Sequence, residues 1–183
     1  MQQAHVLKNI AILFLMTSIF ACTPAGDSKD SQLDSIKSAE DALYGNKDVL
    51  EFDKDKAETL VKAYRGYVKS NPNDSLSANY LFKSAEVLRS LRKFNEAVGI
   101  YKQIGDKYPN YQKAPHSLFL LGFSYENDLN ALPEAKKCYE EFLVKYPKHE
   151  LADDVQFSLN NLGKSPEEII KEFERKRQEQ AGS

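Results

Sequence analysis

The chain has 183 residues, so a single domain is the default expectation. One of its 25 Lys and Arg residues and none of its 27 Asp and Glu residues lie in residues 1–21, so the rest of the chain has a net charge of 24 minus 27, or −3. This small acidic excess argues against nucleic-acid binding and against electrostatic docking on anionic lipid, because both need a basic surface. The apolar fraction of 42% is that of an ordinary globular protein.

The N-terminal residues have the pattern of a secretory signal peptide. Residues 1–9 are polar and include Lys8, and residues 10–20 form an apolar run of 11 residues. A helix needs about 20 apolar residues to cross a bilayer, whereas the apolar part of a signal peptide has about 7–15. We therefore expect residues 1–21 to be a signal peptide that is removed.

The end of this run, Ile19-Phe20-Ala21-Cys22, resembles the lipobox of bacterial lipoproteins. The resemblance implies that the Cys22 thiol receives diacylglycerol, that the signal is cleaved before Cys22, and that the new amine is acylated. Two or three acyl chains anchor a protein stably where one chain does not. Thr23 stands where Asp would favour the inner membrane, so we expect a lipid-anchored protein of the outer membrane that faces the periplasm. A plain secretory signal that ends at a cysteine by chance is the alternative.

Residues 22–40 are rich in Ser, Asp and Lys, and are predicted to be the lipidated cysteine followed by a flexible tether. Apolar residues at 33, 36, 39 and 43 allow a short helix to begin within this stretch. A helical repeat domain is predicted over 41–178, and a disordered tail over 179–183.

Four landmarks recur along the repeat domain. Consecutive members of each set are 37 or 38 residues apart, and the sets are Tyr64, Tyr101 and Tyr139; Pro72, Pro109 and Pro147; Phe82, Phe119 and Phe157; and Ala97 and Ala135. Independent landmarks that share one period indicate a repeat architecture.

The apolar residues between the landmarks have helical spacing, and no segment alternates with the period of a strand. In chain order, helices are expected over 53–70, 76–90, 96–106, 114–126, 133–146, 151–162 and 166–178. Asn95 is expected to cap the third helix and Gly163 to end the sixth. Ser165 and Glu168 have the spacing of a capping box, which opens a last helix that we expect to cap the end of the array.

The residues of the two full repeats match the tetratricopeptide pattern: Leu81, Ala85, Leu88, Ala97, Tyr101 and Pro109 in one, and Leu118, Leu121, Gly122, Tyr125, Ala135, Tyr139 and Pro147 in the next. The chain therefore resembles the tetratricopeptide family over about 53–174. It is similar to the lipoproteins of the outer-membrane β-barrel assembly machinery and to the C-terminal domain of the Tol-Pal periplasmic coordinator. The resemblance implies an all-α fold, a short tetratricopeptide-like α-solenoid of antiparallel helix pairs with about two full and two partial repeats. It also places Gly122 against Ala135, where the helices of one pair come closest.

Motifs of catalysis and metal binding are missing from the sequence. It contains no His-Glu-x-x-His and no Gly-x-Ser-x-Gly, and His116 and His149 lack metal-ligand spacing with Cys138. Cys138 is expected to be a packed helix residue rather than a reactive thiol. We therefore expect no enzymatic activity, no cofactor, no metal and no small-molecule substrate.

The first helices of the pairs are expected to line a concave groove that binds a protein of the cell envelope. In the tetratricopeptide register, the groove residues are Asn79, Phe82, Glu86, Arg89, His116, Phe119, Phe123 and Glu126. Core packing is the alternative for Phe82 and Phe119, whereas Phe123 is expected to point into the groove as an exposed aromatic. The first hypothesis is a membrane-anchored scaffold in envelope or outer-membrane protein assembly. The second is a self-associating structural organiser of the envelope without a dedicated peptide ligand.

Overall fold

The computed structural model describes residues 28–45 and 52–181, and within these ranges the chain is helical, without strands. The elements are α1 (Lys29–Tyr44), α2 (Lys54–Ser70), α3 (Ser77–Ser90), α4 (Phe94–Lys107), α5 (Ala114–Phe123), the π-helical turn η1 (Ser124–Asp128), α6 (Leu132–Lys145), α7 (Ala152–Asn160) and α8 (Pro166–Ala181). Within residues 28–45 and 52–181, no helix has both the length and the apolar content needed to cross a membrane.

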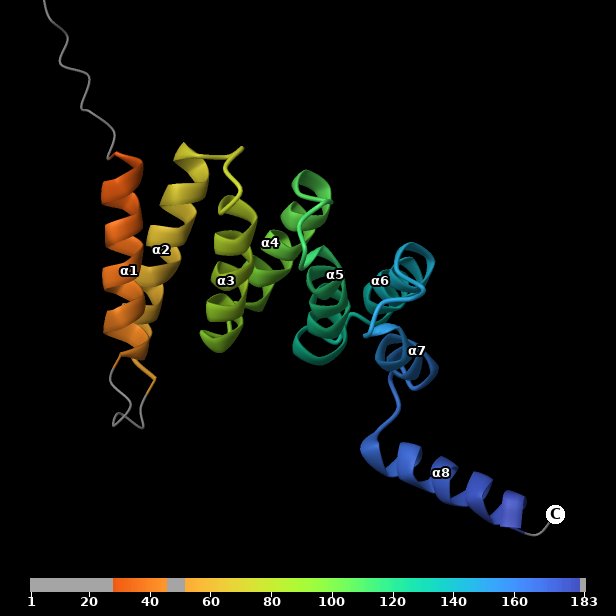
Figure 1. Ribbon diagram of the computed structural model, residues 1–183. Helices are drawn as coiled ribbons and strands as arrows, with labels where there is room; N and C mark the ends of the chain where they lie inside the picture. Colours follow the sequence, from red (N-terminus) through yellow and green to blue (C-terminus); the bar gives the residue numbers. More distant parts are fainter. Residues whose placement is uncertain (1–27, 46–51, 182–183) are drawn as a thin grey trace, which may run out of the picture.

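The helices pack as a row of antiparallel hairpins, and each helix from α2 to α6 contacts the helix before it and the helix after it (Figure 1). The pairs are α1 with α2, α3 with α4, and α5 with α6, while α7 packs on α6 and α8 projects away from the row. The fold is therefore the short tetratricopeptide-like α-solenoid that the sequence predicts. Its first pair, predicted only as a partial repeat, is complete because α1 supplies the missing helix.

The boundary predicted for the tether is wrong, because α1 begins at Lys29 and not near residue 40. The Ser28 side chain caps the helix by accepting a hydrogen bond from the Ser31 backbone N–H at 3.2 Å. Ile36 is buried against the core, and this packing offsets the polar composition that suggested a tether. Cys22 and the whole predicted signal peptide lie outside the described residues.

The C-terminal end also differs from expectation. Helix α8 continues to Ala181, so the predicted boundary between helix and tail at 178 is wrong. The predicted capping box is confirmed, since Glu168 N–H donates to Ser165 Oγ at 3.2 Å and Ser165 N–H donates to Glu168 Oε2 at 2.7 Å. Gly163 ends the preceding segment with φ +77°, a conformation that favours glycine. The prediction that α8 caps the solenoid is wrong, because none of its residues is buried.

The three prolines of the repeat produce one recurring helix end. Asn71, Tyr108 and Tyr146 each precede a proline, and their φ and ψ angles are −130° and 55°, −130° and 52°, and −131° and 51°. Proline disfavours the helical conformation in the residue before it, so α2, α4 and α6 stop at the same backbone geometry. The connection from each helix pair to the next therefore begins with the same backbone conformation.

The helix predicted to run over 114–126 changes its hydrogen bonding at Ser124. Leu129 N–H donates to the Ser124 carbonyl five residues earlier at 3.0 Å, which is the spacing of a π-helix. The turn of this repeat is one residue longer than that of the repeat before it, and η1 accommodates the extra residue. The predicted cap at Asn95 is wrong, since α4 begins at Phe94 and has no side-chain cap.

Gly122 marks the closest approach of α5 and α6, although its neighbour is not the expected one. A Cβ atom at Gly122 would lie 2.6 Å from Cε1 of Tyr139 and 3.1 Å from Cβ of Cys138. Ala135, the predicted neighbour, is buried one turn earlier on α6. Burial raises the pKa of the Cys138 thiol to about 11, which agrees with a packed rather than a reactive cysteine.

We expect Gly122→Leu to destabilise the protein by about 1–3 kcal/mol or more, because the added side chain overlaps the Tyr139 ring. Urea unfolding followed by circular dichroism measures the loss. Gly99→Leu on α4 is the matched control, since nothing lies within 4 Å of a Cβ atom there. Equal unfolding midpoints for Gly122→Leu and the wild type would contradict the close contact.

Candidate functional site

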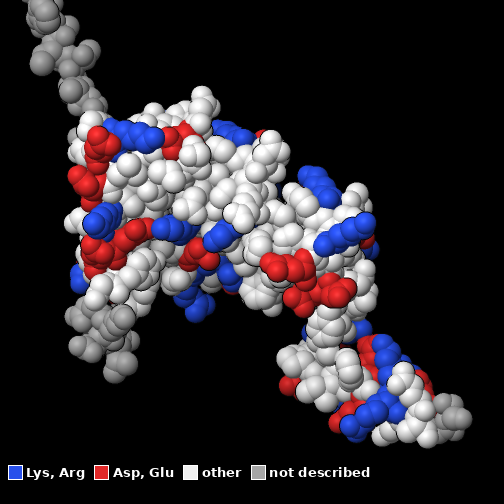
Figure 2. Space-filling view, in the orientation of Figure 1, with Lys and Arg blue, Asp and Glu red and all other residues white. Residues whose placement is uncertain are grey.

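The surface formed by α1, α3, α5 and α7, which we call the A face, is the side of the solenoid turned to the viewer in Figure 1. Two ion pairs join α3 to its neighbours along this face. Lys83 Nζ lies 2.7 Å from Glu40 Oε1, and Arg89 Nε lies 2.9 Å from Asp128 Oδ2. Figure 2 shows basic and acidic side chains interspersed here, without a dominant patch of either sign. A partner of this face is therefore not selected by overall charge.

Two of the predicted groove residues, Asn79 and Phe82 on α3, make contacts within the protein. Only 4% of the Phe82 surface is exposed, and its ring packs edge-on against Tyr101 at a centroid distance of 6.2 Å. Phe82 is therefore a core residue, and its prediction as a partner contact is wrong. Asn79 is half-buried and its Oδ1 accepts a hydrogen bond from the Tyr111 hydroxyl at 3.1 Å. Asn79 thus holds the loop before α5 against α3.

Arg89, Phe119 and Phe123 lie together in the middle of the A face. The Arg89 guanidinium carbon is 5.0 Å from the centre of the Phe123 ring, and the rings of Phe123 and Phe119 are 6.3 Å apart. Phe119 also packs against Tyr139 at 6.3 Å, which ties this group to the core. Phe123 is half-buried rather than fully exposed as predicted, because Arg89 covers part of its ring.

Asp128, on η1, fixes Arg89 over the aromatic ring. The side chains of Arg89 and Asp128 are only 24% and 14% exposed, so their ion pair is shielded from bulk water. A charge-assisted hydrogen bond is stronger than one between neutral groups, and salt screens a partly buried ion pair less than an exposed one. The sequence predicts Arg89 as a groove residue, and the structure shows that its side chain is already held in place by Asp128.

Glu86 and Lys113 are charged residues of this region whose side chains are not used in an ion pair within the described part of the chain. Glu86 is exposed, and neither residue has an ion pair or a side-chain hydrogen bond among the described residues. Surrounding protein atoms raise the pKa of Glu86, and the nearby cations Lys113 and Arg89 oppose that rise. Lys113 Nζ lies 4.8 Å from the centre of the Phe82 ring. These two opposite charges can pair with a bound segment.

Tyrosines from the second helices reach toward carboxylates near the A face. The Tyr64 hydroxyl donates to Glu40 at 2.6 Å, and the Tyr139 hydroxyl donates to Glu126 at 2.7 Å. Burial and these hydrogen bonds raise the pKa of both phenols, so they stay protonated. Glu126 is thus tied to the core. Tyr67 and Tyr101 are exceptions, because their buried hydroxyls have no hydrogen-bond partner in the part of the chain that the structure describes.

His116 lies apart from the aromatic group, near the start of α5. Its ring packs edge-on against His149 at 5.2 Å, and its Nε2 is 3.7 Å from Glu150 Oε1. Burial and the neighbouring His149 lower the pKa of His116. The structure therefore joins Glu86, Arg89, Phe119 and Phe123 into one candidate site, and places Asn79, Phe82, His116 and Glu126 outside it.

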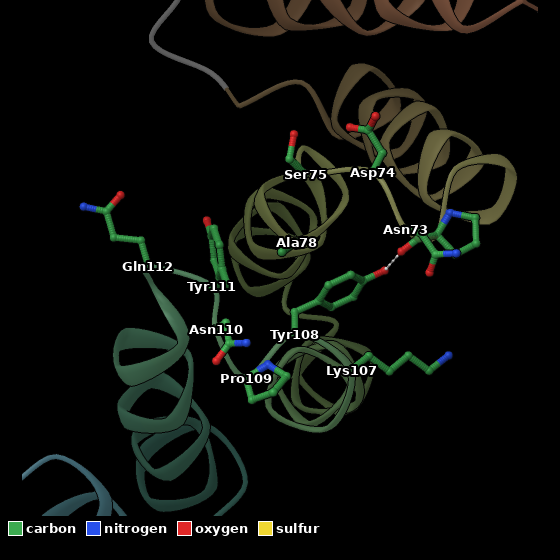
Figure 3. A pocket seen from close by; sticks show the side chains of 11 residues that line it. Asn73, Asp74, Ser75, Ala78, Lys107, Tyr108, Pro109, Asn110, Tyr111 and Gln112 are labelled. Atoms are coloured by element: carbon green, nitrogen blue, oxygen red, sulfur yellow. Dashed lines mark hydrogen bonds between the residues drawn. The ribbon is translucent and has the colours of Figure 1, made fainter.

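Two hollows lie outside the aromatic group of the A face. One, of about 740 Å³, runs between α4 and α6 over α5, and its lining includes Leu118, Tyr125 and Cys138. The other, of about 780 Å³, lies between the loops before α3 and α5 (Figure 3). There the Tyr108 hydroxyl donates to the Pro72 carbonyl at 2.7 Å and links successive loops. Within residues 28–45 and 52–181, no group of three or more His, Cys, Asp or Glu side chains is placed to hold a metal ion.

Sequence reasoning missed Lys113 and Asp128, which lie outside the predicted helix positions. Asp128 follows the residues expected to be helical, and its role depends on η1, which the sequence pattern does not predict. Lys113 precedes α5 in the connecting loop. The extra residue in the turn of the third repeat was the one signal that this segment departs from a regular α-helix.

Comparison with known families supports the repeat interpretation. A model of the tetratricopeptide repeat family matches residues 80–111 and 116–149. These two matches cover α3 with α4 and α5 with α6, which are the two pairs predicted as full repeats. No curated protein sequence matches the chain.

We expect Asp128→Ala to lower the free energy of unfolding by about 1–3 kcal/mol, because Arg89 then loses its partner in a shielded position. Urea unfolding measures the change. Glu58→Ala is the matched control, since it breaks an ion pair with Lys93 whose side chains are 43% and 40% exposed, and such pairs contribute little. Equal midpoints for the two variants would contradict the proposed role of Asp128.

Proposed function

We propose that this chain is a membrane-anchored scaffold lipoprotein that binds a protein partner through the A face and acts in cell-envelope or outer-membrane protein assembly. Tetratricopeptide repeats form extended surfaces for protein–protein interaction, and the family match supports this general role. The anchor and the envelope setting rest on the lipobox resemblance of residues 19–22.

The observation that carries the proposal is the half-buried Phe123 ring held between Arg89 and Phe119. Aromatic and arginine side chains dominate the binding energy of protein interfaces, and they act best when their conformation is fixed in advance. Arg89 is fixed by Asp128, and Phe119 is fixed by Tyr139. This part of the A face is therefore organised before binding.

The side chains around Phe123 indicate what kind of partner segment would fit the site. Phe119 and Phe123 offer an apolar contact, while Glu86 and Lys113 each carry a charge that no ion pair in the described residues uses. The segment that fits has an apolar side chain over the rings and both a basic and an acidic group beside it. An apolar centre with a polar rim is the usual composition of such an interface.

The start of α1 limits how far the A face can lie from the membrane. Six residues separate Cys22 from Lys29, and a chain of this length spans at most about 25 Å when fully extended. With a lipid on Cys22, the solenoid would stay close to the bilayer surface. This favours a partner that is itself at or in the membrane.

Cys22→Ser should abolish the incorporation of labelled palmitate in cells, because the thiol is the proposed acceptor of diacylglycerol. Cys138→Ser is the matched control, since Cys138 is buried in the solenoid, and it should keep the label. Label on the Cys22→Ser protein, or its loss from Cys138→Ser alone, would contradict the anchor.

A pull-down from solubilised membranes with the lipidated full chain should retain a foreign protein in stoichiometric amount. Phe123→Ala should then weaken binding to that protein by 2 kcal/mol or more, about 30-fold, as expected for an interface anchor. The free energy of unfolding should fall by no more than about 1 kcal/mol, because the ring is only half-buried. Calorimetric titration and urea unfolding measure the two quantities.

Two controls separate binding from folding. Val144→Ala, at an exposed apolar residue of α6 on the opposite side of the pair, should leave binding unchanged. Phe82→Ala should instead cost about 3–5 kcal/mol of stability, as a core residue does. If Phe123→Ala lost stability like Phe82→Ala and showed no specific loss of binding, the A face would not be the binding surface.

A further inference from the structure

At the C-terminal end of the solenoid, α7 is not packed closely against a second helix of the described chain as α1, α3 and α5 are. Helices α3 and α5 pack closely against the second helix of their own pair, whereas α7, among the described residues, packs closely only on α6. Helix α8 follows α7 in the sequence but stands away from the row (Figure 1), and none of its residues is buried.

In the described chain, Phe157 on α7 lacks the aromatic cover that the equivalent residue of an earlier repeat has. It occupies the repeat position of Phe82, which is covered by Tyr101 from the second helix of its pair and by Tyr111 from the next loop. Among the described residues no aromatic ring covers Phe157 in this way, and 49% of its surface is exposed. An aromatic residue that is buried in one repeat and open in another marks an unpartnered face.

The sequence of α8 explains why it does not fill the gap itself. The second helices α2, α4 and α6 each have a buried alanine in the first turn, namely Ala57, Ala97 and Ala135. Helix α8 has no alanine before its last residue and carries Ile169 and Ile170 instead. A bulky β-branched residue at the contact prevents the close approach that alanine allows.

Helix α8 has an exposed apolar stripe of its own. Ile170 is 57% exposed and Phe173 is 68% exposed, and they lie one turn apart on the helix. A small hollow of about 150 Å³ between the two helices is lined by Phe157 of α7 and by Ile169 and Phe173 of α8, together with polar residues that include Asn160, Lys164 and Glu172. We call the four apolar residues Phe157, Ile169, Ile170 and Phe173 the C-terminal face.

The opposite end of the solenoid is closed to such contacts. The outer side of α1 exposes small polar residues, namely Asp30, Ser31, Asp34, Ser35 and Ser38. A copy of the chain that docked its C-terminal face on this end would bury carboxylates against aromatic rings. Head-to-tail stacking into a filament is therefore unfavourable, and a self-contact must use the same face on both copies.

The charges of α8 fit an antiparallel copy of the same helix. Residues 166–174 carry four acidic residues and one basic residue, whereas residues 175–181 carry three basic residues and one acidic residue. When two α8 helices lie antiparallel, the acidic half of each meets the basic half of the other, and Phe173, at the middle of the helix, meets its counterpart near the two-fold axis. A parallel arrangement would place like charges together.

We infer that two copies of the chain form a closed, two-fold symmetric dimer through the C-terminal face, with antiparallel α8 helices whose Ile170 and Phe173 cover the open side of α7 at Phe157. The A face stays free in this dimer, so each dimer presents two copies of it. The inference goes beyond the proposed function and does not rest on it.

Sedimentation velocity of the purified full chain in detergent, over a concentration series, tests the inference. The wild type is expected to dimerise, and Phe173→Glu is expected to raise the dissociation constant at least tenfold. Val144→Glu is the matched control, because it places the same charge on an apolar residue that is 80% exposed on α6, and it should dimerise like the wild type. Thermal melts of both variants should match the wild type, since both residues are exposed.

A second pair of variants tests whether the charges of α8 hold the two copies together. Arg175→Glu with Arg177→Glu makes both halves of α8 acidic, and Glu167→Lys with Glu174→Lys reverses the charge of the acidic half. Each double variant alone should lose self-association, and an equimolar mixture of the two should recover it as a heterodimer. A mixture that stays monomeric would overturn the antiparallel pairing.

Two other results of the sedimentation experiment would overturn the dimer. A wild type that stays monomeric at all concentrations would mean that α8 folds back on its own α7 or awaits a foreign protein, and would overturn the dimer. Equal weakening by Phe173→Glu and Val144→Glu would do the same, because it would show a general effect of charge. None of these results depends on whether Phe123→Ala weakens binding at the A face.

Discussion

The buried tyrosine on the second helix of each pair is the contact on which both the core and the A face depend. Tyr64, Tyr101 and Tyr139 fill the space between paired helices, and all three are buried. Two of them also donate hydrogen bonds to carboxylates, Tyr64 to Glu40 and Tyr139 to Glu126. The ring of Tyr139 leaves room for no side chain at Gly122 and supports Phe119. A single residue type thus sets the spacing of the helices and the position of side chains near the proposed binding surface.

The middle of the A face depends on a local irregularity in the third pair. The π-helical turn η1 accommodates one extra residue and brings Asp128 within 2.9 Å of Arg89 on the preceding pair. Arg89 in turn covers part of Phe123. π-Helical turns are frequent at functional sites, because they redirect side chains that a regular helix would place elsewhere. Here the redirected aspartate joins two repeats and fixes an arginine over an aromatic ring.

The helix pairs that repeat along the chain can be predicted from the sequence, whereas the features that differ between repeats cannot. The spacing of the tyrosines, prolines and phenylalanines predicts the helix pairs, and the capping box at Ser165 and Glu168 is confirmed. Periodicity does not say which landmark is covered, so Phe82 was assigned to the groove although it is buried. Nor does it show that α1 begins at Lys29, since that boundary depends on the packing of Ile36 against α2. Helix α8 has a helical sequence, but its missing alanine, visible only by comparison with α4 and α6, decides that it stands apart.

Hydrogen–deuterium exchange can locate the proposed binding of a protein partner on the A face between α3 and α5. The lipidated chain is measured free and in complex with the protein that it retains from membranes. We expect the complex to slow exchange in residues 77–90 and 114–128, and to leave exchange in α4 and α6 unchanged. Slower exchange in α4 and α6 without any change in α3 and α5 would contradict binding at the A face.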